Sequence, residues 1–138
     1  MAESASIVIP ARNAQETLPA CLRALAGQTA AQRVTDVIVV DDGSTDATAQ
    51  CAKAAGARVC HLPGRGAAAA RNLGARHAGG SILLFTDADC EPAPDWVAQM
   101  LSPFDDPDVV GVKGTYVTRQ RELVARFVQL EYEDKYRR

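Results

Sequence analysis

Short runs of β-branched and apolar residues alternate along this chain with longer stretches in which apolar residues recur at helical spacing. The clearest run is TDVIVVD at 35–41, a continuous Val/Ile segment typical of a strand covered on both faces. Strands that alternate with helices predict an α/β fold, with a mainly parallel sheet and helices on both faces. We expect strands at 6–10, 35–41, 57–62, 81–86 (buried) and 109–117, and helices at 14–26, 46–55, 66–78, 94–101 and 122–136.

Composition narrows the class of protein. The chain has 138 residues, of which 47% are apolar and 23% charged, so we interpret residues 1–138 as one folded domain. A formal net charge of −2 and an aromatic content of 5% argue against a nucleic-acid partner. The acidic start does not resemble a secretory signal. The four cysteines form no CxxC pair, and we expect reduced thiols in a cytoplasmic protein.

The most informative motif is Asp87-Ala88-Asp89, directly after the strand expected at 81–86. Ligands of parallel sheets bind beyond the carboxyl ends of the strands. Residues two apart on an extended segment point the same way, so both carboxylates can converge on one hard divalent ion such as Mg²⁺ or Mn²⁺. A polar turn without metal is the alternative. Cys90 stands apart from the other cysteines because it follows this motif.

A second acidic motif, Asp41-Asp42-Gly43-Ser44, follows the strand expected at 35–41. The Asp42 carboxylate can accept hydrogen bonds from N–H groups of a ligand. Gly43 permits the turn, and we expect Ser44 or Thr45 to cap the next helix. A turn and cap alone would explain Gly43 and Ser44 but not the doubled carboxylate.

The glycine-rich segment GRGAAAARNLG at 64–74 offers a helix N-terminus to a phosphate, with Arg71 as a bidentate cation. It also spells GxGxxA, and Asp87 lies about 20 residues further on, as in NAD(P)-binding Rossmann oxidoreductases. The oxidoreductase alternative gives no function to Asp42 or Asp89. A non-catalytic α/β binding module is the other alternative.

Four motifs in order resemble the nucleotide-binding half of a family 2 glycosyltransferase with the GT-A fold, a Rossmann-like, mainly parallel sheet. They extend from Ser6 to about Val97, and they are SIVIPARN, VIVVDDGSTDAT, GRGAAAARNLGARHAGGSILLFTDADC and PDWV. The resemblance implies a glycosyltransferase that binds a UDP- or GDP-sugar, uses Mn²⁺ or Mg²⁺ and inverts the anomeric centre.

The resemblance also implies roles for individual residues on the base side of the donor. Pro10 and Arg12 would border the nucleobase, and Asp42 would hydrogen-bond it. Many relatives carry an aromatic residue where Arg12 stands. A guanidinium plane can also stack on a base, so the choice between uracil and guanine stays open.

On the diphosphate side, the resemblance implies that Arg71 lies near the base or the phosphates and that Asp87 contacts the ribose. Asp89 would act on the diphosphate through the metal. An acidic general base for the acceptor hydroxyl is expected beyond Arg138, because Glu133-Asp134 falls within the helix expected at 122–136.

We therefore interpret the chain as the N-terminal donor-binding part of a longer enzyme, with weak or no transfer activity by itself. The apolar stripe of the expected terminal helix, Leu123, Phe127 and Leu130, would pack on the domain's own sheet or on a second copy in a homodimer. A membrane-associated acceptor would place the longer protein at the inner face of a membrane.

Overall fold

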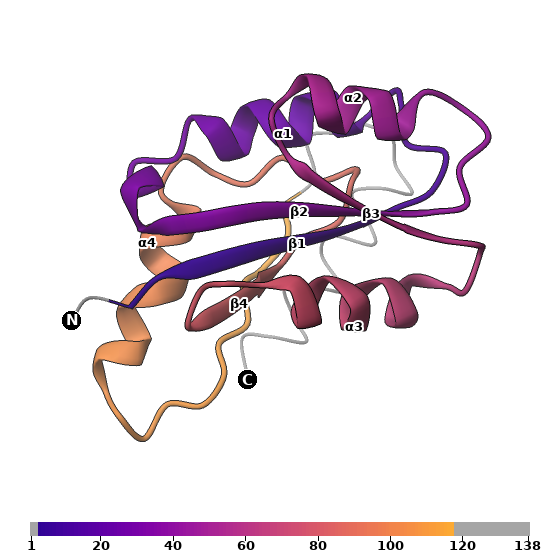
Figure 1. Cartoon of the computed structure of the whole chain (residues 1–138). Coiled ribbons are helices and arrows are strands. Elements are labelled where there is room, and N and C mark those ends of the chain that lie inside the picture. The colour runs from indigo at the N-terminus through magenta and orange to yellow at the C-terminus, as the bar shows by residue number, and fades with distance from the viewer. Residues whose placement is uncertain (1–2, 118–138) are drawn as a thin grey trace.

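Four parallel strands form one sheet in the order β3-β2-β1-β4 (Figure 1). The structure is a computed structural model and describes residues 3–117. The strands are β1 Ala5–Ala11, β2 Val34–Asp42, β3 Arg58–Leu62 and β4 Ile82–Phe85. Val8 of β1 lies opposite Ile38 of β2 and Phe85 of β4. The chain adds β2 and β3 on one side of β1 and β4 on the other, so the order reverses beside β1.

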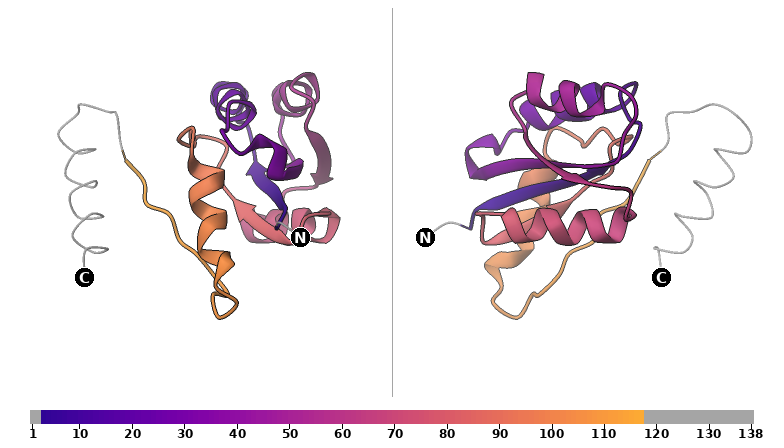
Figure 2. Two further views of the ribbon diagram at one scale, coloured as in Figure 1. Left: turned by 90° about the vertical axis from the view of Figure 1, so that its left-hand side faces the viewer. Right: turned by 45° about the vertical axis from the view of Figure 1, so that its right-hand side comes forward.

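Helices cover both faces of this sheet, as the sequence predicts. The helices α1 Leu18–Ala26 and α2 Thr48–Ala54 lie on one face, and α3 Ala67–His77 lies on the other (Figures 1 and 2). The short helix α4 Trp96–Leu101 contributes to the core on the side of α1. It continues into a 3₁₀ turn, η2 Ser102–Asp105. Another 3₁₀ turn, η1 Ala31–Arg33, precedes β2.

Alternation along β1 and β2 divides their apolar side chains between two cores. Ile7, Ile9 and Val39 pack with α1 and α4, whereas Val8 and Val40 pack with α3. All five are fully buried. Because both faces are covered, these strands have apolar residues at successive positions rather than at every second one.

Close packing of α3 on the sheet depends on Gly74. A Cβ atom at this position would lie 2.3 Å from Cγ1 of Val8 and 3.3 Å from Cγ2 of Val40. Gly74 therefore lets the helix axis approach β1, which sets the position of Arg71 three residues earlier on the same helix.

The strand expected at 109–117 is wrong, because these residues have no regular secondary structure. The strand expected at 81–86 is shorter and is not fully buried. It lies at the sheet edge, where Leu83 and Phe85 are partly exposed and Ile82 and Leu84 are buried. The helix expected at 122–136, with its homodimer interface, lies outside the described residues. Among the described residues no helix is long and apolar enough to cross a membrane.

The capping interpretation of Ser44 and Thr45 is also wrong. Helix α2 begins at Thr48, and the Asp46 carboxylate accepts the N–H of Thr48 at 3.0 Å. Ser44 instead accepts the N–H of Asn13 at 2.9 Å through its hydroxyl oxygen. The two hydroxyl residues therefore serve the loop after β1 and not the helix.

Candidate functional site

The predicted site residues follow three neighbouring strands at one edge of the sheet. Pro10 and Arg12 lie at the end of β1, Asp42 ends β2, and Asp87 and Asp89 follow β4. Since the strands are parallel, their carboxyl ends share this edge, and the strand order reverses there beside β1. Parallel α/β sheets generally bind ligands at such a point. The structure thus places these residues where an α/β sheet binds its ligands.

Asp42 joins the end of β2 to the loop that begins α3. Its Oδ1 accepts the backbone N–H of Arg65 and its Oδ2 that of Gly66, both at 2.7 Å. The carboxylate is buried, and these hydrogen bonds, that from Arg65 foremost, hold the pKa of Asp42 below its usual value. The backbone N–H of Gly64 also hydrogen-bonds this carboxylate and contributes to the lowered pKa. The sequence identified this carboxylate but not its partners in the loop.

The positive φ of Gly64 and Gly66, +81° and +93°, lets the loop turn its amides toward Asp42. From the glycine-rich segment we predicted that the N–H groups at the start of α3 would bind a phosphate. In this structure the Asp42 carboxylate takes that anion's place at the N–H groups of Arg65 and Gly66.

Arg12 is exposed at the rim of the same region, and Pro10 is partly buried on β1. A Cβ atom on Gly64 would lie 3.7 Å from Nη1 of Arg12, so the guanidinium lies beside this loop. Its positive charge also contributes to lowering the pKa of Asp42. The base-side residues that the resemblance implies are therefore neighbours in space.

Asn13 is a residue that sequence reasoning missed. Its φ is +49°, and its side-chain oxygen accepts the N–H of Thr45 at 2.8 Å. The reciprocal bond from the Asn13 N–H to Ser44 ties the loop after β1 to the loop after β2. The available signal was residue type, because asparagine tolerates the left-handed conformation better than most residues.

Arg71 of α3 reaches the loop after β4. Its Nη2 lies 3.0 Å from Oδ1 of Asp87, and the two side chains are 40% and 45% exposed. An ion pair with this much exposure stays open to exchange with a charged ligand. We predicted both residues for the site from the sequence, but not the ion pair between them.

Asp87, Asp89 and Cys90 form a compact group of donor atoms. One donor atom from each lies within 4.8 Å of the other two. The Cys90 thiol lies 3.8 Å from Oδ1 of Asp89, and the Cys90 N–H donates to the main-chain oxygen of Asp87 at 3.1 Å. Burial and the Asp89 charge raise the pKa of the Cys90 thiol. Two carboxylates at this spacing suit a divalent cation.

Two further side chains adjoin this group. Cys21 of α1 is fully buried, and its thiol donates to the main-chain oxygen of Asp87 at 3.6 Å. Burial raises the pKa of Cys21 to about 12. The pKa of Tyr116 is also raised, by burial and then by the Asp87 carboxylate. The segment carrying Tyr116 thus lies near the acidic motif. None of the four cysteines forms a disulfide.

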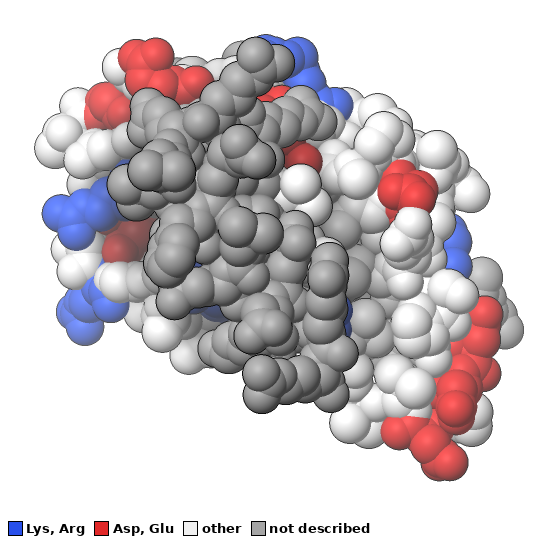
Figure 3. Space-filling view, turned by 180° about the vertical axis from the view of Figure 1, so that it is seen from behind, with Lys and Arg blue, Asp and Glu red and all other residues white. Residues whose placement is uncertain are grey.

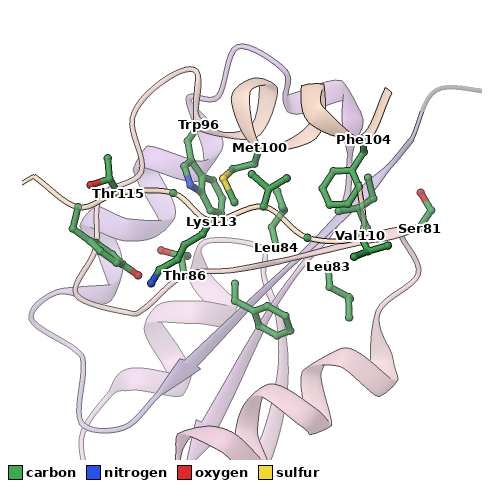
Figure 4. Close-up of a pocket in the computed structure, with 16 residues that line it drawn as sticks. Ser81, Leu83, Leu84, Thr86, Trp96, Met100, Phe104, Val110, Lys113 and Thr115 are labelled. Carbon is green, nitrogen blue, oxygen red and sulfur yellow. The ribbon is translucent and has the colours of Figure 1, made fainter. Parts of the chain in front are cut away.

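A cavity of about 490 Å³ lies elsewhere, along the outer edge of β4 (Figure 4). Trp96, Met100 and Phe104 wall it on one side, and residues 110–116 on another. The predicted site residues do not line it. On the face seen in Figure 3, basic side chains at the left lie beside acidic ones, and acidic side chains gather at the lower right.

Known proteins similar to this chain include glycosyltransferases. Glycosyltransferase AglE of Haloferax volcanii is 35% identical over 121 residues, which are 80% of this chain and 40% of AglE. Mannosyltransferase PcManGT from Pyrobaculum calidifontis, solved with GDP-Man and Mn²⁺, is 28% identical with a TM-score of 0.73, over 79% of this chain and 34% of that one. Glucosyl-3-phosphoglycerate synthase from Mycobacterium tuberculosis, solved with Mn²⁺, UDP and glucosyl-3-phosphoglycerate, is 32% identical with a TM-score of 0.60, over 74% and 39%.

The chain spans less than half the length of the curated relatives it matches. Its four-stranded parallel sheet is the GT-A-like fold of the solved neighbours. The family sequence profile described as "Glycosyl transferase family 2" matches residues 6–138. This chain is therefore a member of glycosyltransferase family 2.

Proposed function

We propose that this chain binds a nucleoside-diphosphate sugar at the carboxyl edge of its sheet and serves as the donor part of a glycosyltransferase. The observation that carries the proposal is the meeting of Arg71, Asp87 and Asp89 beside the reversal of strand order. Neighbours with the same fold hold GDP-Man or UDP together with Mn²⁺.

The base side of the proposed site is Pro10, Arg12 and Asp42. The remaining acceptor capacity of the Asp42 carboxylate takes an N–H group of a uracil or guanine ring, while the bonds from the loop at Gly64, Arg65 and Gly66 are kept. The Arg12 guanidinium stacks on the base from the rim. Both pyrimidine and purine fit this description, so UDP- and GDP-sugars are both candidates.

On the diphosphate side, Asp87 contacts the ribose and Asp89 holds the divalent ion, Mn²⁺ or Mg²⁺. The two carboxylates fit such an ion because both are oxygen donors and lie within 4.8 Å of one another. When bound, the ion stabilises negative charge on the departing nucleoside diphosphate. Arg71, freed from Asp87, adds a second positive charge at the phosphates.

For the longer protein, we propose transfer to an acceptor hydroxyl with inversion, assisted by an acidic general base beyond Arg138. General-base catalysis typically contributes on the order of 10²–10⁴ in rate. We also propose that the acceptor of the sugar is associated with a membrane. Glu133 and Asp134 lie outside the described residues.

The NAD-binding alternative has weaker support. A dinucleotide fold binds the pyrophosphate with the N–H groups at the start of the helix that follows its glycine-rich loop. Here the N–H groups of Arg65 and Gly66 donate to Asp42 instead. A diphosphate at that position would have to displace a buried carboxylate that is also negatively charged.

Thermal-shift and calorimetric titrations with UDP, GDP and NAD, each with and without Mn²⁺, test the proposal. We expect Mn²⁺-dependent stabilisation by UDP or GDP that Asp89→Ala abolishes. Asp105→Ala is the matched control, because this exposed carboxylate lies in η2, outside the carboxyl edge. Stabilisation by NAD alone, indifferent to Asp89→Ala, would overturn the proposal, and no response to any nucleotide would favour a non-catalytic module.

A further inference from the structure

The two strands at the edges of the described sheet differ in sequence. At one edge, β3 carries the exposed side chains of Arg58 and His61. Charged and polar side chains of this kind protect a natural edge strand from pairing with another chain. At the other edge, β4 has the sequence ILLF and no such side chain. Successive apolar residues are typical of an interior strand of a parallel sheet, so the sequence of β4 does not match its position.

The main chain of β4 has hydrogen-bonding groups on both of its sides. The N–H groups of Ile82 and Thr86 donate to main-chain oxygens on the β1 side, at 2.9 and 3.3 Å. Because the direction of these groups alternates along a strand, the N–H groups of Leu83 and Phe85 point to the other side. No strand among residues 3–117 pairs with β4 there. The side chains of Leu83 and Phe85 are also 39% and 42% exposed.

The cavity of about 490 Å³ lies on this outer side of β4. Its far wall consists of residues 110–116, which have no regular secondary structure. Figure 4 shows Val110, Lys113 and Thr115 spaced along the length of β4. Apolar side chains of α4 and η2 form a further wall. An extended peptide fits such a surface, since its main chain pairs with the strand edge and its alternate side chains contact the apolar wall.

We propose that the outer edge of β4 is an interaction surface for one further β-strand, supplied by the part of the longer protein outside this chain. This rests on the proposed function, in which the chain is the donor part of a longer glycosyltransferase. The curated relatives are more than twice as long as the segments that match this chain. Gly111 and Gly114 disfavour residues 110–116 as the pairing strand, because glycine is depleted in strands. The added strand is apolar at the positions that face α4.

Amide hydrogen exchange, followed by NMR on the whole chain, tests whether the edge is unpaired. The N–H groups of Leu83 and Phe85 should exchange at least about tenfold faster than those of Ile82 and Thr86, which are bonded to the β1 side. Ile82 and Thr86 are matched controls because they flank the same two residues.

A variant with an added strand tests whether the edge accepts one. The chain continues past Arg138 with a flexible Gly/Ser linker and about six residues of alternating Val and Thr, a usual strand length. The linker keeps this segment at an effective concentration on the order of millimolar. Exchange at Leu83 and Phe85 should slow at least about tenfold. Fluorescence of Trp96, the one tryptophan of the chain, should shift to shorter wavelength as the cavity fills.

The matched control has the same linker and segment, with Pro at the two central positions. Two adjacent prolines remove an N–H from each side of the added strand, so it cannot form a ladder with β4. Exchange at Leu83 and Phe85 and the emission of Trp96 should then stay at the wild-type values.

Three results would overturn the proposal. Slow exchange of Leu83 and Phe85 in the wild-type chain at every concentration means that the chain's own residues pair with this edge. Slow exchange only at high concentration means that a second copy does. Equal exchange with and without the added strand means that the edge does not accept one. None of these results alters the Mn²⁺-dependent nucleotide titration, so the proposed function is tested separately.

Discussion

The ion pair between Arg71 and Asp87 should contribute little to folding and much to donor binding. The two groups lie 3.0 Å apart with side chains 40% and 45% exposed. An ion pair so open to water is worth about 0–1 kcal/mol of stability, since solvent screens the attraction and ordering two side chains costs entropy. The same exposure leaves both groups available to a ligand.

The perturbation is a double-mutant cycle with Arg71→Gln, Asp87→Asn and both together. Urea unfolding should give a coupling free energy below about 1 kcal/mol. Loss of one charge-assisted hydrogen bond to a ligand costs about 1.5–3 kcal/mol. Each single variant should therefore weaken UDP–Mn²⁺ or GDP–Mn²⁺ binding by roughly 10–150-fold, measured by calorimetry.

A second ion pair in the fold provides the control. Nη1 of Arg58 lies 3.1 Å from Oδ2 of Asp36, and Arg58 begins β3, at the opposite end of that strand from the carboxyl edge. Arg58→Gln removes the same charge and should leave nucleotide binding unchanged. The reasoning fails if the Arg71–Asp87 coupling reaches the 3–5 kcal/mol cost of breaking a buried pair while nucleotide affinity stays at the wild-type value.

Three further predictions address the supporting structure. Gly74→Ala should destabilise the fold by about 1–3 kcal/mol in thermal unfolding, because the added Cβ lies 2.3 Å from Val8 Cγ1; an unchanged melting temperature would contradict this packing. Asp42 has a lowered pKa, so its carboxylate stabilises the fold above the ordinary value of 3.8, and this contribution disappears as pH falls through the lower pKa. The stability difference between wild type and Asp42→Asn should thus shrink between pH 7 and pH 3 in urea titrations, and a constant difference would refute it. Cys21, with a pKa of about 12, should resist iodoacetamide at pH 8 in the native chain and react once unfolded, as mass spectrometry can show; rapid native labelling would count against its burial.

The sheet was predictable where burial alone determines the pattern. Residues Ile38–Val40 are apolar at successive positions because helices cover both faces of β2. The segment 109–117 shows where this reasoning ends. Its apolar residues favour a strand, but a strand also needs a partner, and in the described residues the outer edge of β4 faces a cavity there (Figure 4). Local pattern carries no information on pairing.

The positions of the candidate site residues at the sheet edge were predictable from the sequence, but the contacts among them were not. The position of Asp42 after a strand indicated a carboxylate at the sheet edge. Its hydrogen bonds to Arg65 and Gly66 connect residues 23 and 24 positions apart, and they depend on the left-handed conformation of two glycines. Likewise, the pairing of Arg71 with Asp87 requires α3 to lie close to β1, which the small size of Gly74 permits.

These contacts divide the candidate site into a half held by internal hydrogen bonds and a half with an exposed ion pair. On the proposed base side, Asn13 joins the loops after β1 and β2, and Asp42 joins β2 to the start of α3. Three loops are thus fixed by internal hydrogen bonds before any ligand arrives, which reduces the entropic cost of binding a base. On the proposed diphosphate side, the half-exposed Arg71–Asp87 pair links α3 to the loop after β4. Donor binding should therefore rearrange these two side chains and leave the loops of the base side in place.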